Sequence, residues 1–521
     1  MTSVRAASDV PDSGAPGVPL LPGLAAWAAG LRPEDVPRRV RALATSQVLS
    51  QLASIRAGAA HPLGRRLTGA FGPPLQDDPR TGACVLAGLG SWLNLDDTAY
   101  AGHLSNSTVA VPLAFALAGE LDGAALLTAV VAANECAARI TAAATLGPLR
   151  GQSAIHTHLA GGVAGRLHCE GADAARWTDA LGLAFAMPGL PLMRAFLSSD
   201  GRLFNAFTPV RTAMDACDGA AAGLGGAPDI LEHPDGFLAR FASVPLPEAL
   251  RDRLGSRWYT ETLSFKLRPG GPGIDAAVDC ALELHGVLGA VASEEVAEVA
   301  VDTSLYTLYA GRLADRYVTG PDAPLGALVL HTPYPVATAL LTGSLTEADF
   351  AAPRIDEPGR WELADRVQLR HDPELTRALF ASVAPFGEAV RQAGDAADGW
   401  LRSFGGEETV RLAREASPGS PAVGAGTVSA TASFAAATKA TGARVTVRLR
   451  DGRTVSRERL IPLGAAGPHT RANHQELTRE KFLSLGGPDD VAKAAPRLDL
   501  MGRHELRDWV TRALHQDPPA P

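Results

Sequence analysis

Residues 122–140 read DGAALLTAVVAANECAARI, and this stretch indicates the fold class. Leu126, Val130 and Ala133 recur at helical spacing and Arg139 stands near the end, so the pattern predicts a helix. Residues 173–186 (DAARWTDALGLAFA) form a second such stretch. Small side chains let helix axes approach closely. The Ala-, Leu- and Gly-rich composition of residues 22–263 therefore predicts a large all-helical domain.

Farther along the chain the hydrophobic period changes from helical to alternating. Residues 295–301 (EVAEVAV) alternate as a half-buried strand does. Residues 445–450 (VTVRLR) and 453–455 (RTV) flank Asp451-Gly452, which is a strong hairpin signal. Helical composition returns from Asn473. We therefore expect a mainly α protein with an α+β domain inserted after about residue 268, and a helical tail that rejoins the first domain.

The predicted organisation has four parts. Residues 1–21 carry acids and prolines where a signal peptide needs an apolar run, so we expect a flexible leader. The all-helical domain follows at 22–268, the α+β domain at 269–464 and the C-terminal helices at 465–521. Residues 416–442 are rich in Ala, Ser, Gly and Thr, which is typical of a loop or linker.

Composition excludes several classes of protein. The 521 residues are 46% hydrophobic and 20% charged, which excludes wholesale disorder, and the net charge of −8 with no basic block argues against nucleic acid or a membrane as partner. The longest apolar region, 109–133, is interrupted by Pro112, Glu120 and Asp122, so it cannot supply the about 20 apolar residues of a membrane span. Five cysteines without a C-x-x-C pair suit reduced thiols. We expect a soluble cytoplasmic protein.

Familiar catalytic and cofactor motifs are absent from the sequence. It has no G-x-S-x-G elbow, Walker A loop, H-E-x-x-H or credible dinucleotide turn. His156 and His158 lie two residues apart, which on a helix points them about 200° apart and away from one ion. We therefore predict no metal site.

What the sequence offers instead is a set of polar residues inside apolar, glycine-punctuated segments. In isolation each has an ordinary structural explanation. Aspartates cap helices, a lone histidine is usually a structural residue whose hydrogen bonds are satisfied, and lysines beside turns face solvent. Together they indicate a site with a general acid or base and cations for an anionic substrate. The residues are Asp96, Asp97, Thr98, His103, His156 and Lys266.

Lysine is rare in this chain. Of 48 basic residues only four are lysines. Lys439 falls in the low-complexity stretch and Lys493 in a polar tail, so we expect both to be solvated, whereas Lys481 belongs to a terminal helix. Lys266 lies at the boundary between the helical half and the mixed half. It is therefore the lysine for which we expect a functional role.

Several stretches, in the same order over nearly the whole chain, resemble the MmgE/PrpD family, which includes 2-methylcitrate dehydratase, cis-aconitate decarboxylase and iminodisuccinate epimerase. Residues 94–98 (NLDDT) resemble the family's D-F-D-D-T, and His156 is followed by glycines six and nine residues later, as in the family. Residues 201–206 (GRLFNA), 265–270 (FKLRPG) and 332–337 (TPYPVA) resemble further family motifs.

The resemblance implies a helical domain of N- and C-terminal segments, an α+β lid, and an active site in the cleft between them. It also implies a homodimer that acts on a carboxylate-bearing small molecule without an organic cofactor. By this resemblance His156 is the leading proton-transfer group, Lys266 a carboxylate anchor or general acid, and His103 an assistant. The substrate-binding residues it implies are Asp96, Asp97, Thr98, Arg202, Asn205 and Arg268.

The chain departs from the family at chemical positions. The family histidine after D-D-T would fall at Ser105, the family lysine is Arg202, and the cysteine of the lid-entry motif is Gly271. Residues 377–441 look inserted. These changes favour a lyase, of the dehydratase or decarboxylase type, for a substrate other than 2-methylcitrate or cis-aconitate, as in specialised metabolism. An isomerase or epimerase using the same proton abstraction, and a non-catalytic scaffold, are the alternatives.

Overall fold

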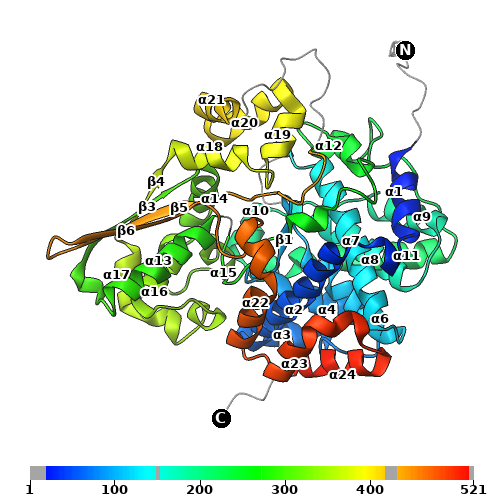
Figure 1. Ribbon diagram of the computed structural model, residues 1–521, viewed down its shortest axis with the longest axis horizontal. Helices are drawn as coiled ribbons and strands as arrows, with labels where there is room; N and C mark the ends of the chain where they lie inside the picture. Colours follow the sequence, from blue (N-terminus) through cyan, green and yellow to red (C-terminus); the bar gives the residue numbers. More distant parts are fainter. Residues whose placement is uncertain (1–18, 148–152, 272, 417–430, 516–521) are drawn as a thin grey trace, which may run out of the picture.

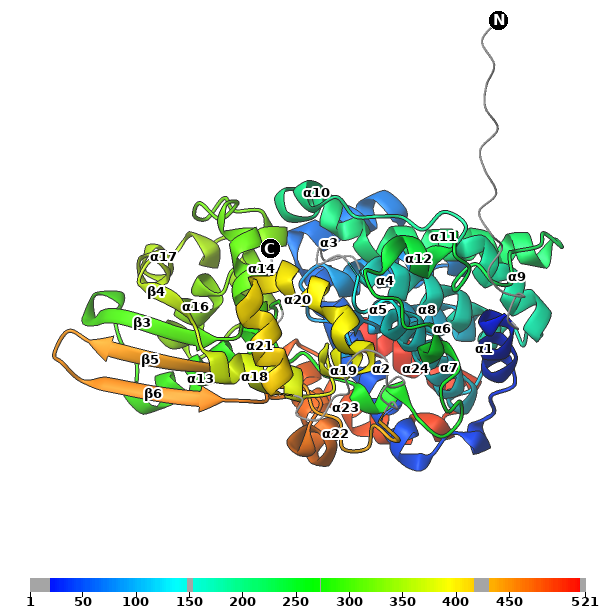
Figure 2. The ribbon, with the colours of Figure 1, turned by 90° about the horizontal axis from the view of Figure 1, so that it is seen from above.

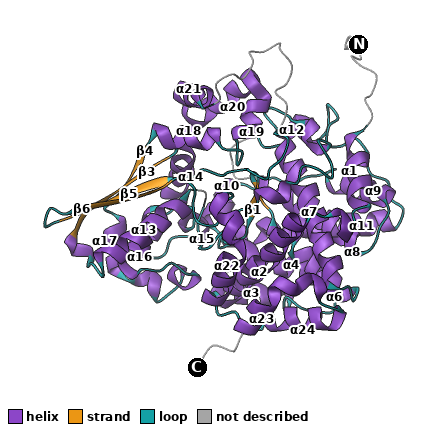
Figure 3. Cartoon of the chain, in the orientation of Figure 1, coloured by secondary structure: helices purple, strands orange, loops and turns teal. Residues whose placement is uncertain are grey.

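The computed structural model describes residues 19–147, 153–271, 273–416 and 431–515. Figure 1 shows a helical body on one side and a sheet with its own helices on the other. Figure 3 shows that helices make up most of the chain and that the strands gather at one end. The predicted fold class, mainly α with a smaller α+β part, is confirmed.

The described part of the helical body begins with twelve α-helices and one short hairpin. Its helices are α1 (Leu20–Ala29), α2 (Arg38–Ala60), α3 (Pro62–Phe71), α4 (Pro79–Ser91), α5 (Ser105–Thr108), α6 (Ala110–Ala118), α7 (Gly123–Ala143), α8 (Ser153–Cys169), α9 (Ala174–Ala184), α10 (Met193–Ser198), α11 (Phe204–Ala221) and α12 (Phe237–Phe241). The hairpin joins β1 (Thr98–Ala99) to β2 (Gly102–His103) and pairs Thr98 with His103.

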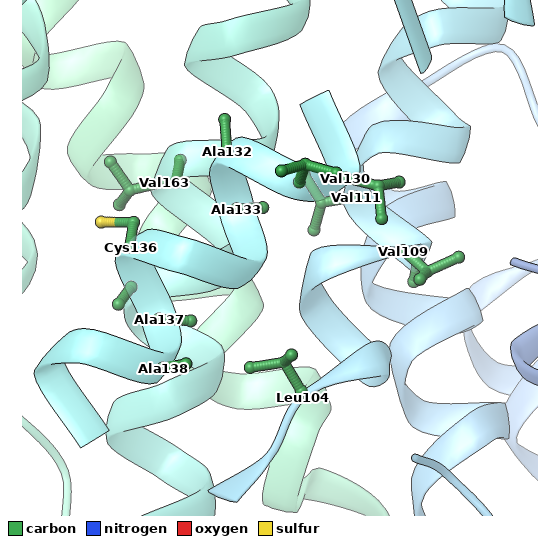
Figure 4. Close-up of a cluster of buried hydrophobic side chains, with 14 of the residues drawn as sticks. Leu104, Val109, Val111, Val130, Ala132, Ala133, Cys136, Ala137, Ala138 and Val163 are labelled. Atoms are coloured by element: carbon green, nitrogen blue, oxygen red, sulfur yellow. The ribbon is translucent and has the colours of Figure 1, made fainter. Parts of the chain in front are cut away.

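Helix α7 is the centre of this body. Asp122 caps it by accepting the backbone N–H of Ala125 at 2.9 Å, which explains where the helix starts. Figure 4 shows its small residues, among them Ala133 and Ala137, facing neighbouring helices, and both are fully buried. Such residues let α8 pack closely along α7.

Among the described residues, α7 is also the one helix long and apolar enough to cross a membrane. The sequence indicates 109–133 as the longest apolar region, whereas the long apolar helix of the structure spans 123–143. Because 89% of the most apolar window of α7 is buried inside the protein, it has the environment of a core helix in a folded domain.

A four-stranded sheet forms the core of the second part, in the order β4-β3-β5-β6. Its strands are β3 (Val296–Thr303), β4 (Val367–His371), β5 (Ala443–Leu449) and β6 (Thr454–Arg459), and β3 runs parallel to β4 and antiparallel to β5. Helices α13 (Ile274–Leu288), α14 (Leu305–Asp315), α15 (Leu325–Leu328), α16 (Pro333–Thr342) and α17 (Pro358–Ala364) accompany it. The predicted hairpin is present: β5 and β6 pair across Asp451-Gly452, and Gly452 has a φ of 93°.

Four helices lie above both parts in Figure 1: α18 (Pro373–Ala381), α19 (Gly387–Ala393), α20 (Asp398–Gly405) and α21 (Glu407–Glu415). They fall within or beside the predicted insertion at 377–441 and share one hydrophobic cluster, which also includes Leu146 of the helical body. Trp400 donates its indole N–H to the carbonyl of Gly147, so this core is attached to the helical body. The predicted low-complexity loop at 416–442 lies partly outside the described residues, and its remainder, 431–442, carries no helix.

The C-terminal helices return to the helical body. They are α22 (Pro468–Ser484), α23 (Asp489–Ala494) and α24 (Arg503–Leu514). Figure 2 shows α22 and α24 beside α2, and Phe482 and Trp509 belong to the same buried core as α2. This packing places α22 against α2, where Lys481 of α22 donates to the hydroxyls of Ser50 and Ser54.

Candidate active site

Four distant chain segments lie side by side at the junction of the two parts. The backbone of Thr98 exchanges two hydrogen bonds with Ser264, at 3.0 and 2.8 Å. Ser264 accepts the N–H of Ala466 at 3.0 Å through its hydroxyl, and the carbonyl of Ala466 accepts the N–H of Lys439 at 2.9 Å. The β1 segment, the start of the α+β part and the two segments that flank β5 and β6 therefore form one wall.

Asp96 and His103 form a carboxylate–imidazole pair beside this wall. His103 Nδ1 lies 2.9 Å from Oδ2 of Asp96, which is fully buried. Burial alone would raise the pKa of Asp96, but the charge and hydrogen bond of His103, with His158 and Lys266, hold it below its usual value. An ionised carboxylate only accepts hydrogen bonds, so Nδ1 of His103 carries the proton and Nε2 is left for a substrate.

A second imidazole, that of His158, belongs to the same charge cluster. Its Nδ1 lies 3.2 Å from the hydroxyl oxygen of Ser107, and that hydroxyl donates to the carbonyl of Leu104. The hydroxyl hydrogen is thereby used, so Nδ1–H of His158 is the donor and Nε2 is a bare lone pair. Nε2 is buried and has no hydrogen-bond partner within the described part of the chain. Burial lowers the pKa of His158 to about 3, against the charge of Asp96.

Glycine in α8 explains how His158 reaches this position. A Cβ atom on Gly165 would lie 2.8 Å from Cδ of Pro112, and one on Gly162 would lie 2.8 Å from Cβ of Ala213. Only glycine permits such close contact with α6 and α11. The spacing of glycines that resembles the family is therefore a packing requirement that fixes the rotation of α8.

The same rotation turns His156 away from the cluster. Its ring packs between Phe237 and Phe241 of α12, with ring centroids 4.5 and 4.2 Å away, and 2% of the residue is exposed. Among the residues that the structure describes, neither ring nitrogen has a hydrogen-bond partner of normal geometry. Burial lowers the pKa of His156 to about 4, with a weaker opposing effect from the backbone of Gly189. The structure therefore does not bring the leading candidate from the sequence to the other site residues, and places His158 there instead.

Two lysines reach the wall. Lys266 is buried, and its ammonium donates to the carbonyl of Gly270. Lys439 is half-buried and donates to the hydroxyl of Thr98 at 2.9 Å. The prediction that Lys439 is solvated is therefore wrong, because the segment before β5 folds back onto β1 instead of extending into solvent. The prediction for Lys493 is confirmed, since 68% of its side chain is exposed.

Asp97, adjacent to Asp96, is turned toward the interior. Its carboxylate accepts the hydroxyl of Ser50 at 2.7 Å and that of Ser105 at 3.3 Å, and lies 3.7 Å from the ammonium of Lys481. Burial raises the pKa of Asp97 to about 6 and lowers that of Lys481 to about 8, with each partner's charge opposing the shift of the other. Asp97 therefore joins α22 to α2 and supports the loop that carries Asp96.

Arg202 is buried near Asp96, whose charge acts on it. Its Nε donates to the carbonyl of Trp92 at 2.9 Å and Nη2 donates to Oδ1 of Asn94, while Nη1 is buried without a partner among the described residues. Burial lowers the pKa of Arg202 to about 10. Asn205, one turn along, is half-buried, and its Oδ1 is likewise unpaired within the described ranges.

Arg268 is engaged elsewhere. Its guanidinium pairs with Asp279 of α13 at 2.7 Å, and 27% of its side chain is exposed. Asp279 in turn accepts the backbone N–H of Leu463 at 2.8 Å. Arg268 thus ties the start of the α+β part to α13, and its predicted contact with a substrate has no support in this geometry.

The cluster has the groups that acid–base chemistry on an anion requires. It holds one imidazole oriented by a carboxylate, a second with a bare lone pair, and the cations Lys266, Lys439 and Arg202. Among the residues the structure describes, no group of three His, Cys, Asp or Glu side chains could hold a metal ion.

Comparison with known proteins gives two matches. Residues 23–249 match the model of the MmgE/PrpD N-terminal domain, and residues 271–395 match that of the MmgE/PrpD C-terminal domain. The second match ends inside the predicted insertion. No individual curated protein matches the chain.

Proposed function

Because the chain belongs to the MmgE/PrpD family, which includes dehydratases and decarboxylases, we propose that it is a lyase acting on a carboxylate-bearing small molecule by acid–base chemistry. The observation that carries the proposal is the convergence of His103, held by Asp96, and of His158, whose Nε2 has no partner among the described residues. Proton transfer at carbon needs a positioned base, and an imidazole whose other nitrogen is fixed can serve.

In the proposed reaction His103 is the base. Its Nε2 takes a proton from the carbon next to the substrate carboxylate, and the Asp96 carboxylate stabilises the imidazolium that forms. As the carbon–oxygen bond breaks, a second group returns a proton to the leaving oxygen so that water departs. In a decarboxylation, the carbon–carbon electron pair is protonated after carbon dioxide leaves.

The cations in the cluster hold the anion. Lys266 and Arg202 stand near Asp96, so an empty site carries more positive than negative charge. A bound carboxylate would offset this excess, and it would also raise the pKa of the buried His158, because a nearby negative charge favours the imidazolium. Neutral His158 accepts a hydrogen bond from the substrate through Nε2.

The test is product analysis with purified protein and a panel of hydroxy-di- and tricarboxylates, followed by mass spectrometry. A product lighter by water or carbon dioxide supports the lyase. A product of unchanged mass with solvent deuterium at one carbon supports the isomerase or epimerase alternative. If no substrate turns over while the Asp96→Asn and His158→Asn variants keep the biological function, the protein is a non-catalytic member.

A further inference from the structure

We propose that Lys439, supplied by the inserted segment, is a substrate-contacting residue of this site whose ammonium binds a carboxylate beside Thr98. The inference rests on the proposed function, which already uses Lys266 and Arg202 as cations. It adds a residue that lies outside both matched family domains, since the second match ends at residue 395.

The backbone of this segment is fixed on both sides. Lys439 donates its N–H to the carbonyl of Ala466 at 2.9 Å, and the N–H of Ala384 donates to the carbonyl of Thr438 at 3.1 Å. Ala384 and Lys439 form an isolated parallel bridge. The position of the side chain therefore follows from backbone pairing with two other segments, one of them just before α19.

A buried ion pair anchors the same segment to the helical body. Glu388 of α19 pairs with Arg257 and also accepts the backbone N–H of Thr431 at 2.8 Å. Phe434, which is fully buried, packs on the guanidinium of Arg257 at 4.0 Å from the ring centroid. Contacts of this kind hold residues 431–442 against the helical body, so that Lys439 does not sample solvent as a free linker lysine would.

The surroundings of the Lys439 ammonium point to an anion. It donates one hydrogen bond, to Thr98, and an ammonium has three N–H donors. The like charge of Lys266 acts on it, and the charges of Asp275 and Asp96 oppose this with smaller effects. Two ammonium groups close enough to repel each other are stabilised when an anion binds to both.

Electrostatics supports the same assignment. Burial lowers the pKa of Lys439 to about 8, and Lys266 adds to the shift. At neutral pH the group is therefore mostly charged and can bind a carboxylate.

The rarity of lysine makes a direct test possible. Protein grown with isotope-labelled lysine carries four labelled side chains, and the single Lys→Arg variants assign their NMR signals. Acetate, succinate and citrate are titrated as probes, with chloride at matched ionic strength as the control. We expect succinate and citrate to shift the signals of Lys439 and Lys266 saturably and to leave that of the exposed Lys493 in place.

Binding of succinate to variants gives the second readout. We expect Lys439→Met to weaken it about tenfold or more, as loss of a charged hydrogen bond does. Lys439→Arg should restore most of the affinity, and Lys493→Met should have no effect. If the Lys266 signal shifts and the Lys439 signal does not, this inference is overturned and the proposed function stands. If neither shifts with any carboxylate, both fall. Should Lys439→Met fail to fold, the titration of the unmodified protein still decides.

Discussion

His103 Nδ1 lies 2.9 Å from the carboxylate of Asp96, and Asp96 is completely buried while His103 keeps 24% of its side chain exposed. The acidic partner is thus shielded from water and the basic partner faces the open side of the junction. This arrangement fixes the tautomer of His103, with Nδ1 protonated and Nε2 free to act as a base.

Replacing Asp96 by asparagine tests that role. The amide is nearly isosteric but can present N–H to Nδ1, which favours the wrong tautomer of His103. We expect kcat to fall by about a thousandfold or more, on the scale known for such carboxylate–histidine pairs. Steady-state kinetics on the substrate identified by product analysis measures the effect.

The matched control is Asp490→Asn, which changes an exposed carboxylate on α23 that pairs with Arg512. This variant should keep the rate of the unmodified protein. A rate for Asp96→Asn within a few fold of that of Asp490→Asn would contradict the assignment of His103 as the base.

Substitution of the two histidines of α8 should affect activity to very different degrees. His158→Asn keeps a donor for Ser107 but removes the bare Nε2, so we expect activity to fall by about a hundredfold or more. His156→Leu removes an imidazole that packs against the rings of Phe237 and Phe241, and activity should stay within about threefold of normal. Parallel kinetics on the two variants checks this, and the reverse ranking would return the proton-transfer role to His156.

The sequence could predict that a histidine of this helix faces the site, but not which one. Its spacing places His156 and His158 on different faces, and similarity to the family selects His156. The choice between them depends on where Phe237 and Phe241 of α12 pack, about 80 residues along the chain. Local pattern carries no information on that contact.

Lys439 illustrates a similar limit. The composition around Lys439 predicts a solvated loop. No local sequence pattern predicts where this segment, which lies beyond the matched family domains, runs in the fold. What fixes it is pairing with Ala466 and Ala384, and a contact with Thr98 that spans 341 residues. By contrast, the helix at 122–140, the Asp451-Gly452 hairpin and the position of Lys266 at the junction follow from local signals, and the structure contains all three.

His156→Leu should also change the pH dependence of stability. The pKa of His156 is lowered from 6.5 to about 4, so between these values the unfolded chain binds a proton that the folded chain does not. The stability linked to neutral His156 is therefore full above pH 6.5 and is lost as the pH falls. Leucine cannot titrate, so the variant should gain about 1 kcal/mol relative to the unmodified protein between about pH 7.5 and pH 5.5.

Denaturant unfolding at the two pH values measures this gain. The comparison is made between variant and unmodified protein at each pH, because other buried groups titrate in both. A difference that does not grow on acidification would mean that the His156 imidazole is already protonated in the folded protein, and so that it is not desolvated as the structure indicates.

The Asp97–Lys481 pair should behave as a structural unit. Lys481→Met leaves a buried carboxylate without its cation, and we expect the free energy of unfolding to fall by about 3–5 kcal/mol. Adding Asp97→Asn to that variant should recover part of the loss, because the uncompensated charge is then removed. The exposed pair Asp489–Lys493 is the control, and the same double cycle there should give less than about 1 kcal/mol. Additive effects at Asp97 and Lys481 would show that the two groups do not act together.

Lys266→Arg distinguishes a fixed charge from a proton donor. The ammonium of Lys266 is buried and donates to one carbonyl, that of Gly270, whereas guanidinium is planar, bulkier and does not release its proton. If Lys266 gives a proton to the leaving group, kcat should fall by about a hundredfold while the affinity for succinate changes little. If it only holds a carboxylate, kcat should stay near normal, and Lys266 would be a fixed charge and no proton donor. Lys493→Arg, on the exposed face of α23, controls for the general effect of the exchange, and circular dichroism confirms that both variants are folded before kcat and KM are compared.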